Sequence, residues 1–347
     1  DPLWSRGLGD VYKRQDYNVI GAVPQDTNYS VTNTSAINAN SYVSTLSTTS
    51  TNYIIAPPNN FIWTISARTI TITSSGSTSF TYSGQSQSVG YNVAGVVPED
   101  VDWFVSNVSK TNANNYTATL STTSSNYTIG TPSAFNWTID PLVITIVSSG
   151  STIFTYSGQS QSVGYSVIGV IPQDSGWSVT GTSKIDASSY SATLLATSSN
   201  YTLGTPNTFT WTINPSVLSI VSSGSTSFTY SGQSQSVGYS VTGVFPEDVD
   251  WSVTGISGTN ANSYTAAITT TSSNYSIGTP NTFTWSIGPL AITIASSGST
   301  SFTYSGQSQS VGYSIVGAVP QDTNYSVTGI SGTNANSYIA CLLYTSD

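Results

Sequence analysis

The sequence predicts an all-β protein, an elongated tandem array of small antiparallel β domains, and three observations predict it. The segment from Phe80 to Tyr91 recurs unchanged from Phe154, Phe228 and Phe302, each time 74 residues further along. A fixed period of this kind is the signature of one repeated structural unit. Within each period, short runs alternate apolar and polar residues between turn signals, as strands do. No window carries the apolar stripe of a helix.

The repeat that spans residues 215–288 shows the expected strands in order. About seven are predicted: 217–221, 228–230, 237–241, 251–253, 264–268, 274–277 and 283–287. Turn residues such as Ser222–Ser225 and Asn260–Ser263 separate them at the spacing of an all-β sandwich or small barrel. Strand order cannot be read from periodicity, so an immunoglobulin-like sandwich and a β-grasp-like sheet both remain open.

The same 74-residue period predicts which residues form the core and where the joints between repeats lie. The closing strand of each repeat carries a tryptophan that we expect to be buried: Trp63, Trp137, Trp211 and Trp285. A 74-residue unit is small and buries only about 60% of its unfolded surface. We therefore expect neighbouring repeats to contact one another. Joints fall at 66/67, 140/141, 214/215 and 288/289, and proline follows three of them, which predicts short, stiff connections.

These joints define the domain organisation. We expect a partial repeat at 16–66, complete repeats at 67–140, 141–214 and 215–288, and a partial repeat at 289–340.

The two ends do not follow the repeat. One back-translation of Cys341–Ser346, read as its reverse complement in a shifted frame, encodes Asp10–Gln15. Both segments resemble the translated end of a sequencing-library adapter. We interpret residues 1–15 and 341–347 as artefact and exclude them from fold reasoning. The remaining segment starts and stops inside a repeat, so we expect it to be an internal fragment of a longer gene.

Composition excludes several classes of function. Only 6% of residues are charged and the net charge is −9, which argues against nucleic-acid binding. No apolar run is long enough to insert into a membrane. The chain has no histidine, and its only cysteine, Cys341, lies in the excluded tail, so the usual nucleophile–base pairs are missing. We predict neither catalysis nor a cofactor.

The order of motifs within each repeat resembles a known family. Tyr-Ser-Gly is followed by a Pro-x-Asp loop, Asn-Ala-x-x-Tyr, Asn-Tyr-Thr and a closing Phe-x-Trp-x-Ile. This order is similar to the MBG-type (YGX/YDG-like) β repeats of large bacterial surface proteins and adhesins, and covers essentially all of 16–340. The family's usual Asn-Ala-Gly-x-Tyr has lost its glycine here, where asparagine or Ser188 stands. The resemblance implies an extracellular stalk or adhesive region at a bacterial cell surface.

The Pro-x-Asp loop carries the acidic residues that could hold a metal ion. Calcium prefers six to eight oxygen ligands. The candidate ligands cluster in two repeats: Glu99, Asp100, Asp102, Glu247, Asp248 and Asp250. The same loop holds one acid in the other copies, at Asp26, Asp174 and Asp322. The aspartate present in every copy is therefore interpreted as bonding its own turn backbone. A glycosidase pair is not expected, because adjacent acids on one loop do not face each other across a sugar.

Aromatic residues supply the candidate ligand site. Trp103, Trp177 and Trp251 follow the acidic loop, where exposed rings could stack on a sugar. The alternative is that they are core residues of a strand, as period-two aromatics usually are. The segment Tyr-Ser-Gly-Gln-Ser-Gln-Ser is interpreted as an edge strand with an uncharged, solvated outer side.

Two functions remain open on these observations. The leading hypothesis is a non-catalytic stalk or spacer whose partners are the neighbouring repeats of the same chain. The alternative is a multivalent array that binds surface glycans or host proteins weakly and gains avidity from repetition. Exposed, co-linear rings at Trp103, Trp177 and Trp251 would favour binding, and buried rings would favour the stalk.

Overall fold

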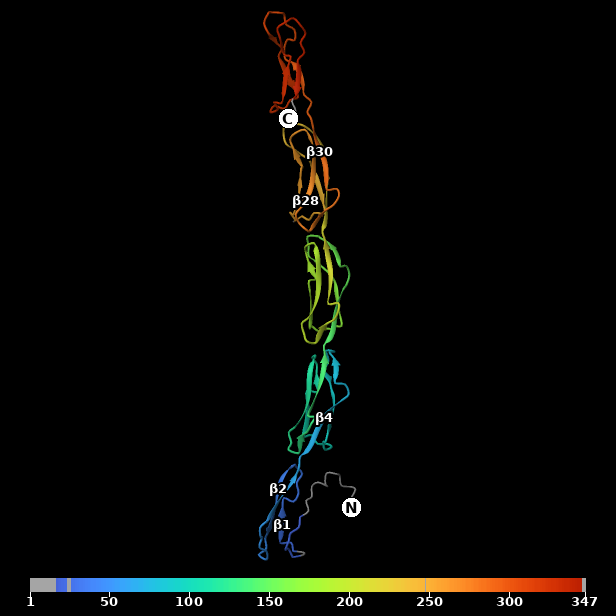
Figure 1. The fold of residues 1–347 in the computed structure, drawn as a ribbon, viewed down its shortest axis with the longest axis vertical. Helices are drawn as coiled ribbons and strands as arrows, with labels where there is room; N and C mark the ends of the chain where they lie inside the picture. The colour runs from blue at the N-terminus through green and yellow to red at the C-terminus, as the bar shows by residue number, and fades with distance from the viewer. Residues whose placement is uncertain (1–16, 24–25, 247, 345–347) are drawn as a thin grey trace. The chain divides into compact units, whose positions relative to one another are not determined.

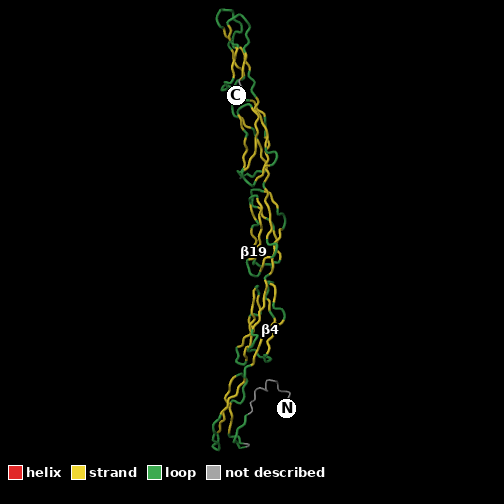
Figure 2. The backbone as a smooth tube through the Cα atoms, in the orientation of Figure 1, coloured by secondary structure: helices red, strands yellow, loops and turns green. Residues whose placement is uncertain are grey.

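The computed structural model describes residues 17–23, 26–246 and 248–344, which form strands and loops without a helix (Figure 2). The predicted all-β class is confirmed. The chain divides into two compact units. Unit 1 comprises Asp1–Val147, Val167–Val179 and Leu194–Asn207, and unit 2 comprises Ser148–Ser166, Thr180–Thr193 and Thr208–Asp347. Within the described residues, no helix has the length and apolarity needed to cross a membrane. The predicted domain boundaries and elongated shape stay predictions.

In unit 1, the repeat at 67–140 is a sandwich of two mixed sheets. Its strands are β4 (Arg68–Ser75), β5 (Ser79–Thr81), β6 (Gln87–Ser88), β7 (Gly90–Ala94), β8 (Trp103–Ser106), β9 (Ser109–Lys110), β10 (Asn114–Thr122), β11 (Tyr127–Ile129) and β12 (Ala134–Asp140). One sheet has the order β11-β4-β7 and the other β5-β12-β10-β8, while β6 and β9 pair separately. Ile70 and Ile72 from the first sheet share a core with Leu120 from the second. Two sheets around one core make a sandwich rather than a β-grasp-like sheet.

The inward face of the larger sheet is built around the predicted tryptophan. Trp137 is 1% exposed, and its indole Nε1 donates a 2.9 Å hydrogen bond to the carbonyl of Asn107. Asn107 lies in a turn with φ of 57°, a conformation that asparagine tolerates and that aims this carbonyl inward. The equivalent residues Trp63, Trp211 and Trp285 are 6%, 1% and 2% exposed, so the prediction that all four are core residues is confirmed.

In unit 2, the repeat at 215–288 has the same topology. Its strands are β22 (Ser216–Ser222), β23 (Ser227–Thr229), β24 (Gln235–Ser236), β25 (Tyr239–Thr242), β26 (Trp251–Thr254), β27 (Ser257–Gly258), β28 (Asn262–Thr270), β29 (Tyr275–Ile277) and β30 (Thr282–Gly288). The sheets are β25-β22-β29 and β23-β30-β28-β26, with β28 beside β30 (Figure 1). The sequence did not predict β24 and β27, because two-residue strands are too short to show a period.

Two groups of side chains, side by side, cover one face of the larger sheet of this repeat. Ile268 on β28 packs with Leu218 and Ile220 of the smaller sheet. Further along the same face, Trp285 and Ile287 pack with Val237, next to the paired strands β24 and β27. Residues two apart share a face of a strand, so one alternating pattern supplies both halves of the core.

The repeat at 141–214 contributes to both units. Its strands are β13 (Leu142–Ser148), β14 (Ile153–Thr155), β15 (Gln161–Ser162), β16 (Tyr165–Ile168), β17 (Trp177–Thr180), β18 (Ser183–Lys184), β19 (Ser188–Ala196), β20 (Tyr201–Leu203) and β21 (Thr208–Asn214). In unit 1, β13 pairs in parallel with β20. In unit 2, β21 pairs with β14 and with β19.

The two partial repeats contain fewer strands. The first has β1 (Tyr29–Thr32), β2 (Asn40–Thr48) and β3 (Asn60–Ile65), in one sheet. The last has β31 (Thr293–Ser296), β32 (Gln309–Ser310), β33 (Tyr313–Val316), β34 (Tyr325–Thr328), β35 (Ser331–Gly332) and β36 (Cys341–Tyr344). Strand β36 comes from the segment interpreted as adapter translation and pairs with β34. Residues 1–15 and 345–347 of the predicted artefact lie outside the described residues.

Candidate functional site at the joints between repeats

The candidate site is the set of contacts that joins one repeat to the next. In unit 1, β12 ends at Asp140 and β13 begins at Leu142, so Pro141 alone connects the two strands. In unit 2, Pro215 alone connects β21 to β22. Proline has a fixed φ and restricts the residue before it, so a one-residue connection of this kind has little freedom. Side chains near each proline make further contacts between the two repeats.

A tyrosine of one repeat bonds the loop aspartate of the next. In unit 1, the hydroxyl of Tyr82 donates to Oδ2 of Asp174 at 2.7 Å, across 92 residues of sequence. The hydroxyl of Tyr201 donates to the same oxygen at 2.9 Å, and its ring meets that of Tyr82 edge-on at 5.6 Å between centroids. The backbone N–H of Gly176 donates to the other oxygen, Oδ1, at 3.2 Å. Three donors therefore satisfy one carboxylate.

Unit 2 repeats this arrangement one period later. The hydroxyl of Tyr156 donates to Oδ2 of Asp248 at 2.8 Å. The Tyr156 ring lies edge-on to Phe245 and to Tyr275, each at 5.5 Å between centroids. Tyr156 is only 7% exposed, as Tyr82 is. Edge-to-face aromatic pairs contribute about 0.5–1.5 kcal/mol beyond the area they bury.

An asparagine makes a further contact at three of the four joints. The side-chain Oδ1 of Asn200 accepts the backbone N–H of Ala113 at 2.7 Å, and its Nδ2 donates to Oδ1 of Asn112 at 3.2 Å. The equivalent bonds to the backbone are Ala39 to Asn126 at 2.6 Å and Ala187 to Asn274 at 2.7 Å. This asparagine belongs to the Asn-Tyr motif, and the backbone it binds belongs to the Asn-Ala turn of the preceding repeat, or to Asp-Ala in the case of Ala187.

The glycine of Tyr-Ser-Gly permits the close approach. Gly84 has a φ of 74°, which L side chains rarely adopt, and a Cβ on it would lie 3.1 Å from Cγ2 of Ile171. Gly158 packs in the same way against Phe245 in unit 2. A side chain at either glycine would strain the backbone and crowd the loop of the neighbouring repeat.

The hydrogen bonds shift the ionisation of both partners. The bond to Asp174, together with burial, raises the pKa of Tyr82 to about 12. Burial and the bond to Asp248 raise the pKa of Tyr156 to about 12. The same bond from Tyr82 lowers the pKa of Asp174. Burial opposes ionisation of Asp248, yet hydrogen bonds from Tyr156 and Tyr275 hold its pKa below the usual value. Each pair is therefore stable as neutral tyrosine and ionised aspartate.

Of the acidic candidates for a metal site, Asp100 bonds the backbone of its own turn. Oδ1 of Asp100 accepts the backbone N–H of Asp102 at 3.1 Å, and Oδ2 accepts the Tyr127 hydroxyl at 2.7 Å. The interpretation that this aspartate bonds its own turn is confirmed. Glu99 is exposed, with a φ of 67°. Among the described residues no group of three acidic, histidine or cysteine side chains is arranged to hold a metal ion. Asp250 is exposed beside the half-buried Asp248, and Glu247 lies outside the described residues.

The three candidate ligand-binding tryptophans are half-buried strand residues. Trp103 packs against Ile70 and Leu120 in unit 1, and Trp251 packs against the core of unit 2. The indole N–H groups of Trp103, Trp177 and Trp251 are buried and have no hydrogen-bond partner within the described part of the chain. These buried N–H groups are not available to bond a ligand at the surface.

Sequence reasoning missed the two residues that make the joints. Tyr82 and Tyr156 stand in the segment interpreted as a solvated edge strand, but both are buried. The asparagine of Asn-Tyr-Thr was noted as part of a motif but was not predicted to contact the preceding repeat. A signal was present, because a tyrosine and an asparagine recur every 74 residues, as the loop aspartate does. The sequence gives no indication that residues 92 positions apart meet.

Comparison with known proteins adds little to what the contacts at the joints indicate. No protein-family model matches the chain, and no curated protein matches it. Among solved structures, the chain is similar to the three N-terminal domains of the Highly Immunogenic Outer Capsid protein (Hoc) of bacteriophage RB49. The identity is 13% and the TM-score 0.22, with 65% of this chain and 100% of that chain covered. A TM-score this low supports no inference about function. The fold and joints themselves define the class: an all-β protein of tandem sandwich repeats.

Proposed function

We propose that the chain is a non-catalytic spacer, the stalk region of a large extracellular surface protein such as a bacterial adhesin. The observation that carries this proposal is the repetition of the joint. The Tyr–Asp bond and the asparagine contact recur at the repeat period, and each joins successive repeats within a unit. The polar side chains named at the joints bind within the chain, which is what a load-transmitting spacer needs.

Composition and resemblance supply the surface assignment. With 6% charged residues and a single cysteine, the chain carries few reactive groups. The motif order is similar to MBG-type repeats, which implies the exterior of a bacterial cell. Under this proposal the partners of each repeat are its neighbours in the chain.

The alternative, a multivalent array for surface glycans or host proteins, has less support. It relied on Trp103, Trp177 and Trp251. All three are half-buried, and Trp103 and Trp251 pack against a core, which favours the spacer. No nucleic-acid partner and no catalytic role are proposed, for the compositional reasons given above.

Small-angle scattering of the full chain tests the spacer. A nine-residue strand such as β28 spans about 30 Å, so four to five repeats in line would reach about 140 Å with a radius of gyration near 40 Å. A compact globule of this length has a radius of gyration of about 20 Å. Deleting residues 141–214 should shorten the longest dimension by one repeat, whereas an equal deletion from a globule would barely change it. A value near 20 Å would overturn the proposal.

A further inference from the structure

One joint places a carboxylate directly before a proline. The residue pairs at the four joints are Ser66–Ala67, Asp140–Pro141, Asn214–Pro215 and Gly288–Pro289. The other Asp–Pro pair of the chain, Asp1–Pro2, lies in the excluded terminal segment. Asp140 and Pro141 are both exposed, so water reaches the peptide bond between them. This bond belongs to the covalent link of the joint, because Pro141 alone separates β12 from β13.

The carboxylate of Asp140 is bonded at one oxygen and free at the other. Ser79 lies on β5, which pairs in parallel with β12, and its Oγ donates a 2.9 Å hydrogen bond to Oδ2 of Asp140. This bond limits the rotation of the carboxylate, while Oδ1 accepts no hydrogen bond from the described residues. The adjoining strands β5, β10 and β13 contain no charged residue, so none of them offers Asp140 an ion pair.

The main-chain carbonyl of Asp140 accepts a hydrogen bond of its own. The backbone N–H of Tyr82 donates to this carbonyl oxygen at 2.8 Å. A donor at this position makes the carbonyl carbon more electrophilic and stabilises the negative charge that develops on the oxygen when a nucleophile attacks. The corresponding bonds at the other two proline joints are Tyr156 to Asn214 and Tyr230 to Gly288, each 2.8 Å. The donor is therefore common to three joints, whereas the carboxylate is present at one.

We propose that Asp140–Pro141 is a self-cleavage site, at which the chain breaks its own main chain in mild acid. Oδ1 of Asp140 attacks the carbonyl carbon of the same residue and forms a cyclic anhydride, and the C–N bond to Pro141 breaks. The electron pair of that bond stays on the proline nitrogen, which takes a proton from the acidic solvent and leaves as a secondary amine. Water then opens the anhydride, which restores the side-chain carboxyl group and creates a new α-carboxyl group. Attack within one residue is efficient because the nucleophile is already in place.

Cleavage converts a covalent joint into one that side-chain contacts alone hold together. After the break, Tyr82 still bonds Asp174, and Asn200 still bonds the backbone of Ala113 across the joint. Hydrogen bonds of this kind contribute about 1 kcal/mol each, so the two pieces separate when they are diluted or pulled. The inference goes beyond the spacer function and does not depend on it, because it adds a point of release that acid controls.

The test incubates the full chain at about pH 4, where aspartate carboxylates and solvent protons are both present, and in parallel at neutral pH. Mass spectrometry of the acidic sample should detect a fragment that begins at Pro141, and the neutral sample should stay intact. The bonds 214/215 and 288/289 are internal controls that should also stay intact. Asp140→Asn removes the nucleophile and should slow cleavage at 140/141 by at least about 100-fold. Near-ultraviolet circular dichroism shows whether this variant, changed at an exposed residue, keeps its fold.

The joint at 214/215 provides a matched gain of function. Ile153 stands there at the position of Ser79, one period later, and cannot bond a carboxylate. Asn214→Asp supplies the carboxylate alone, and adding Ile153→Ser supplies the hydroxyl, which should speed cleavage at 214/215 by at least about tenfold.

Unfolding separates the role of the structure from the chemistry of the dipeptide. In urea at the same pH, the bonds from Ser79 and Tyr82 are lost, so cleavage at 140/141 should be at least about tenfold slower than in the native chain. An intact native chain at pH 4, or cleavage at 140/141 that persists in Asp140→Asn, overturns the proposal. Equal rates in the native and unfolded chains overturn it as well, because the joint would then contribute nothing to the reaction.

Discussion

The complete repeat at 215–288 and the partial repeat at 289–340, which we call the open repeat, contain the same tetrapeptide in different structural states. Ser-Phe-Thr-Tyr occurs at 227–230 and at 301–304. In the first copy it contains β23, paired with β30. In the second it forms no strand, and Phe302 and Tyr304 are exposed. Because the local sequence is identical, the difference comes from the partner strand.

Two other segments of the open repeat follow the same rule. Strand β22 begins at Ser216 and pairs with β29 over its first three residues, whereas β31 begins only at Thr293, three residues later in the period. Strand β28 runs from Asn262, but residues 336–340 are not strand and only β36, which has a partner in β34, is formed. In unit 1, residues 53–55 likewise form no strand, although the equivalent Tyr127–Ile129 pairs with β4. Long-range pairing, rather than local propensity, forms these strands.

The largest expected effect is the conversion of the complete repeat into the open form. Trp285→Ala removes a ring that is stacked on Tyr264 at 4.6 Å and edge-on to Phe228 at 5.8 Å, and that bonds the Gly255 carbonyl. Such truncations cost about 3–5 kcal/mol. Native-state hydrogen exchange should report this loss on β28 and β30, and β23 should exchange as fast as residues 301–303. A β23 that stays protected would show that pairing is not what holds it.

The second prediction compares the identical tetrapeptides directly. In the complete repeat, the N–H of Tyr230 donates to the carbonyl of Gly288 at 2.8 Å. The amides of 227–230 should exchange at least about 100-fold more slowly than those of 301–304, a difference of about 2.7 kcal/mol in opening free energy. Because the side chains match, intrinsic exchange rates need no correction between them. Equal exchange rates would mean that the hydrogen bonds of β23 protect its amides no better than those of residues 301–304 are protected.

Much of the fold could be predicted from these residues, because a strand with one buried face shows it in its alternation. The closing-strand tryptophans and the turn role of Asp100 are local consequences of pattern and turn chemistry. The two-residue strands β24 and β27 could not be predicted, since their pairing is held by contacts from other segments. The Tyr82–Asp174 bond was equally hidden, because period and composition say nothing about which faces of successive repeats meet.

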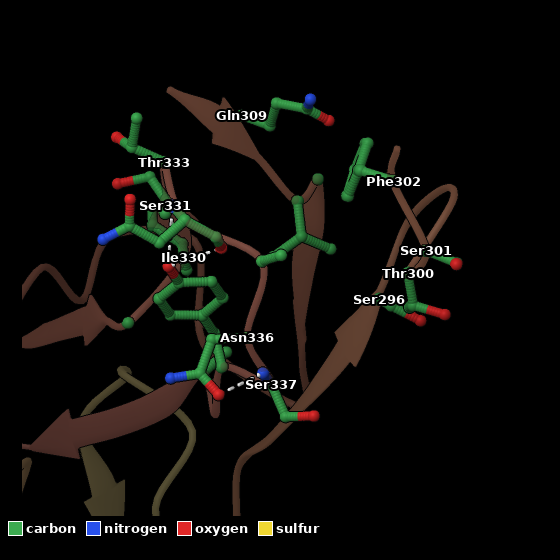
Figure 3. Close-up of a pocket in the computed structure, with 18 of the residues that line it drawn as sticks. Ser296, Thr300, Ser301, Phe302, Gln309, Ile330, Ser331, Thr333, Asn336 and Ser337 are labelled. Atoms are coloured by element: carbon green, nitrogen blue, oxygen red, sulfur yellow. Dashed lines mark hydrogen bonds between the residues drawn. The ribbon is translucent and has the colours of Figure 1, made fainter. Parts of the chain in front are cut away.

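A third prediction uses one core position in both repeats. Val237 is 3% exposed and packs with Trp285, while Val311 lines a cavity in the open repeat (Figure 3). Val237→Ala removes two buried methyl groups, at about 0.8 kcal/mol each, and should destabilise its repeat by about 1.5 kcal/mol. Val311→Ala should cost less than about 0.5 kcal/mol, because no closing strand contacts it. Native-state hydrogen exchange measures the loss of stability of each repeat in chains of the same length. Equal losses from the two substitutions would contradict the comparison.

The smallest effect concerns the tyrosine of Tyr-Ser-Gly, which is buried at a joint in one repeat and exposed in the open repeat. Tyr156→Phe removes the hydrogen bond to Asp248 and should destabilise unit 2 by about 1 kcal/mol near pH 8. Tyr304→Phe, at a residue 65% exposed, should change nothing measurable. Thermal unfolding followed by near-ultraviolet circular dichroism, with both variants at the same concentration, gives the two shifts.

The pKa shifts determine how the stabilising effect of the Tyr156–Asp248 hydrogen bond changes with pH. The pKa of Tyr156 is raised to about 12 in the folded protein from 10.0, so its stabilising effect is complete below pH 10 and is lost as the pH rises towards 12. The pKa of Asp248 is lowered from 3.8, so the carboxylate contributes above that value and its contribution is lost as the pH falls below it. The stability difference between the native chain and Tyr156→Phe should therefore be largest between pH 5 and 9 and shrink at both extremes. A difference that stayed constant up to pH 12 would show that the hydroxyl acts only by filling space, and the joint would then depend on packing rather than on its hydrogen bond.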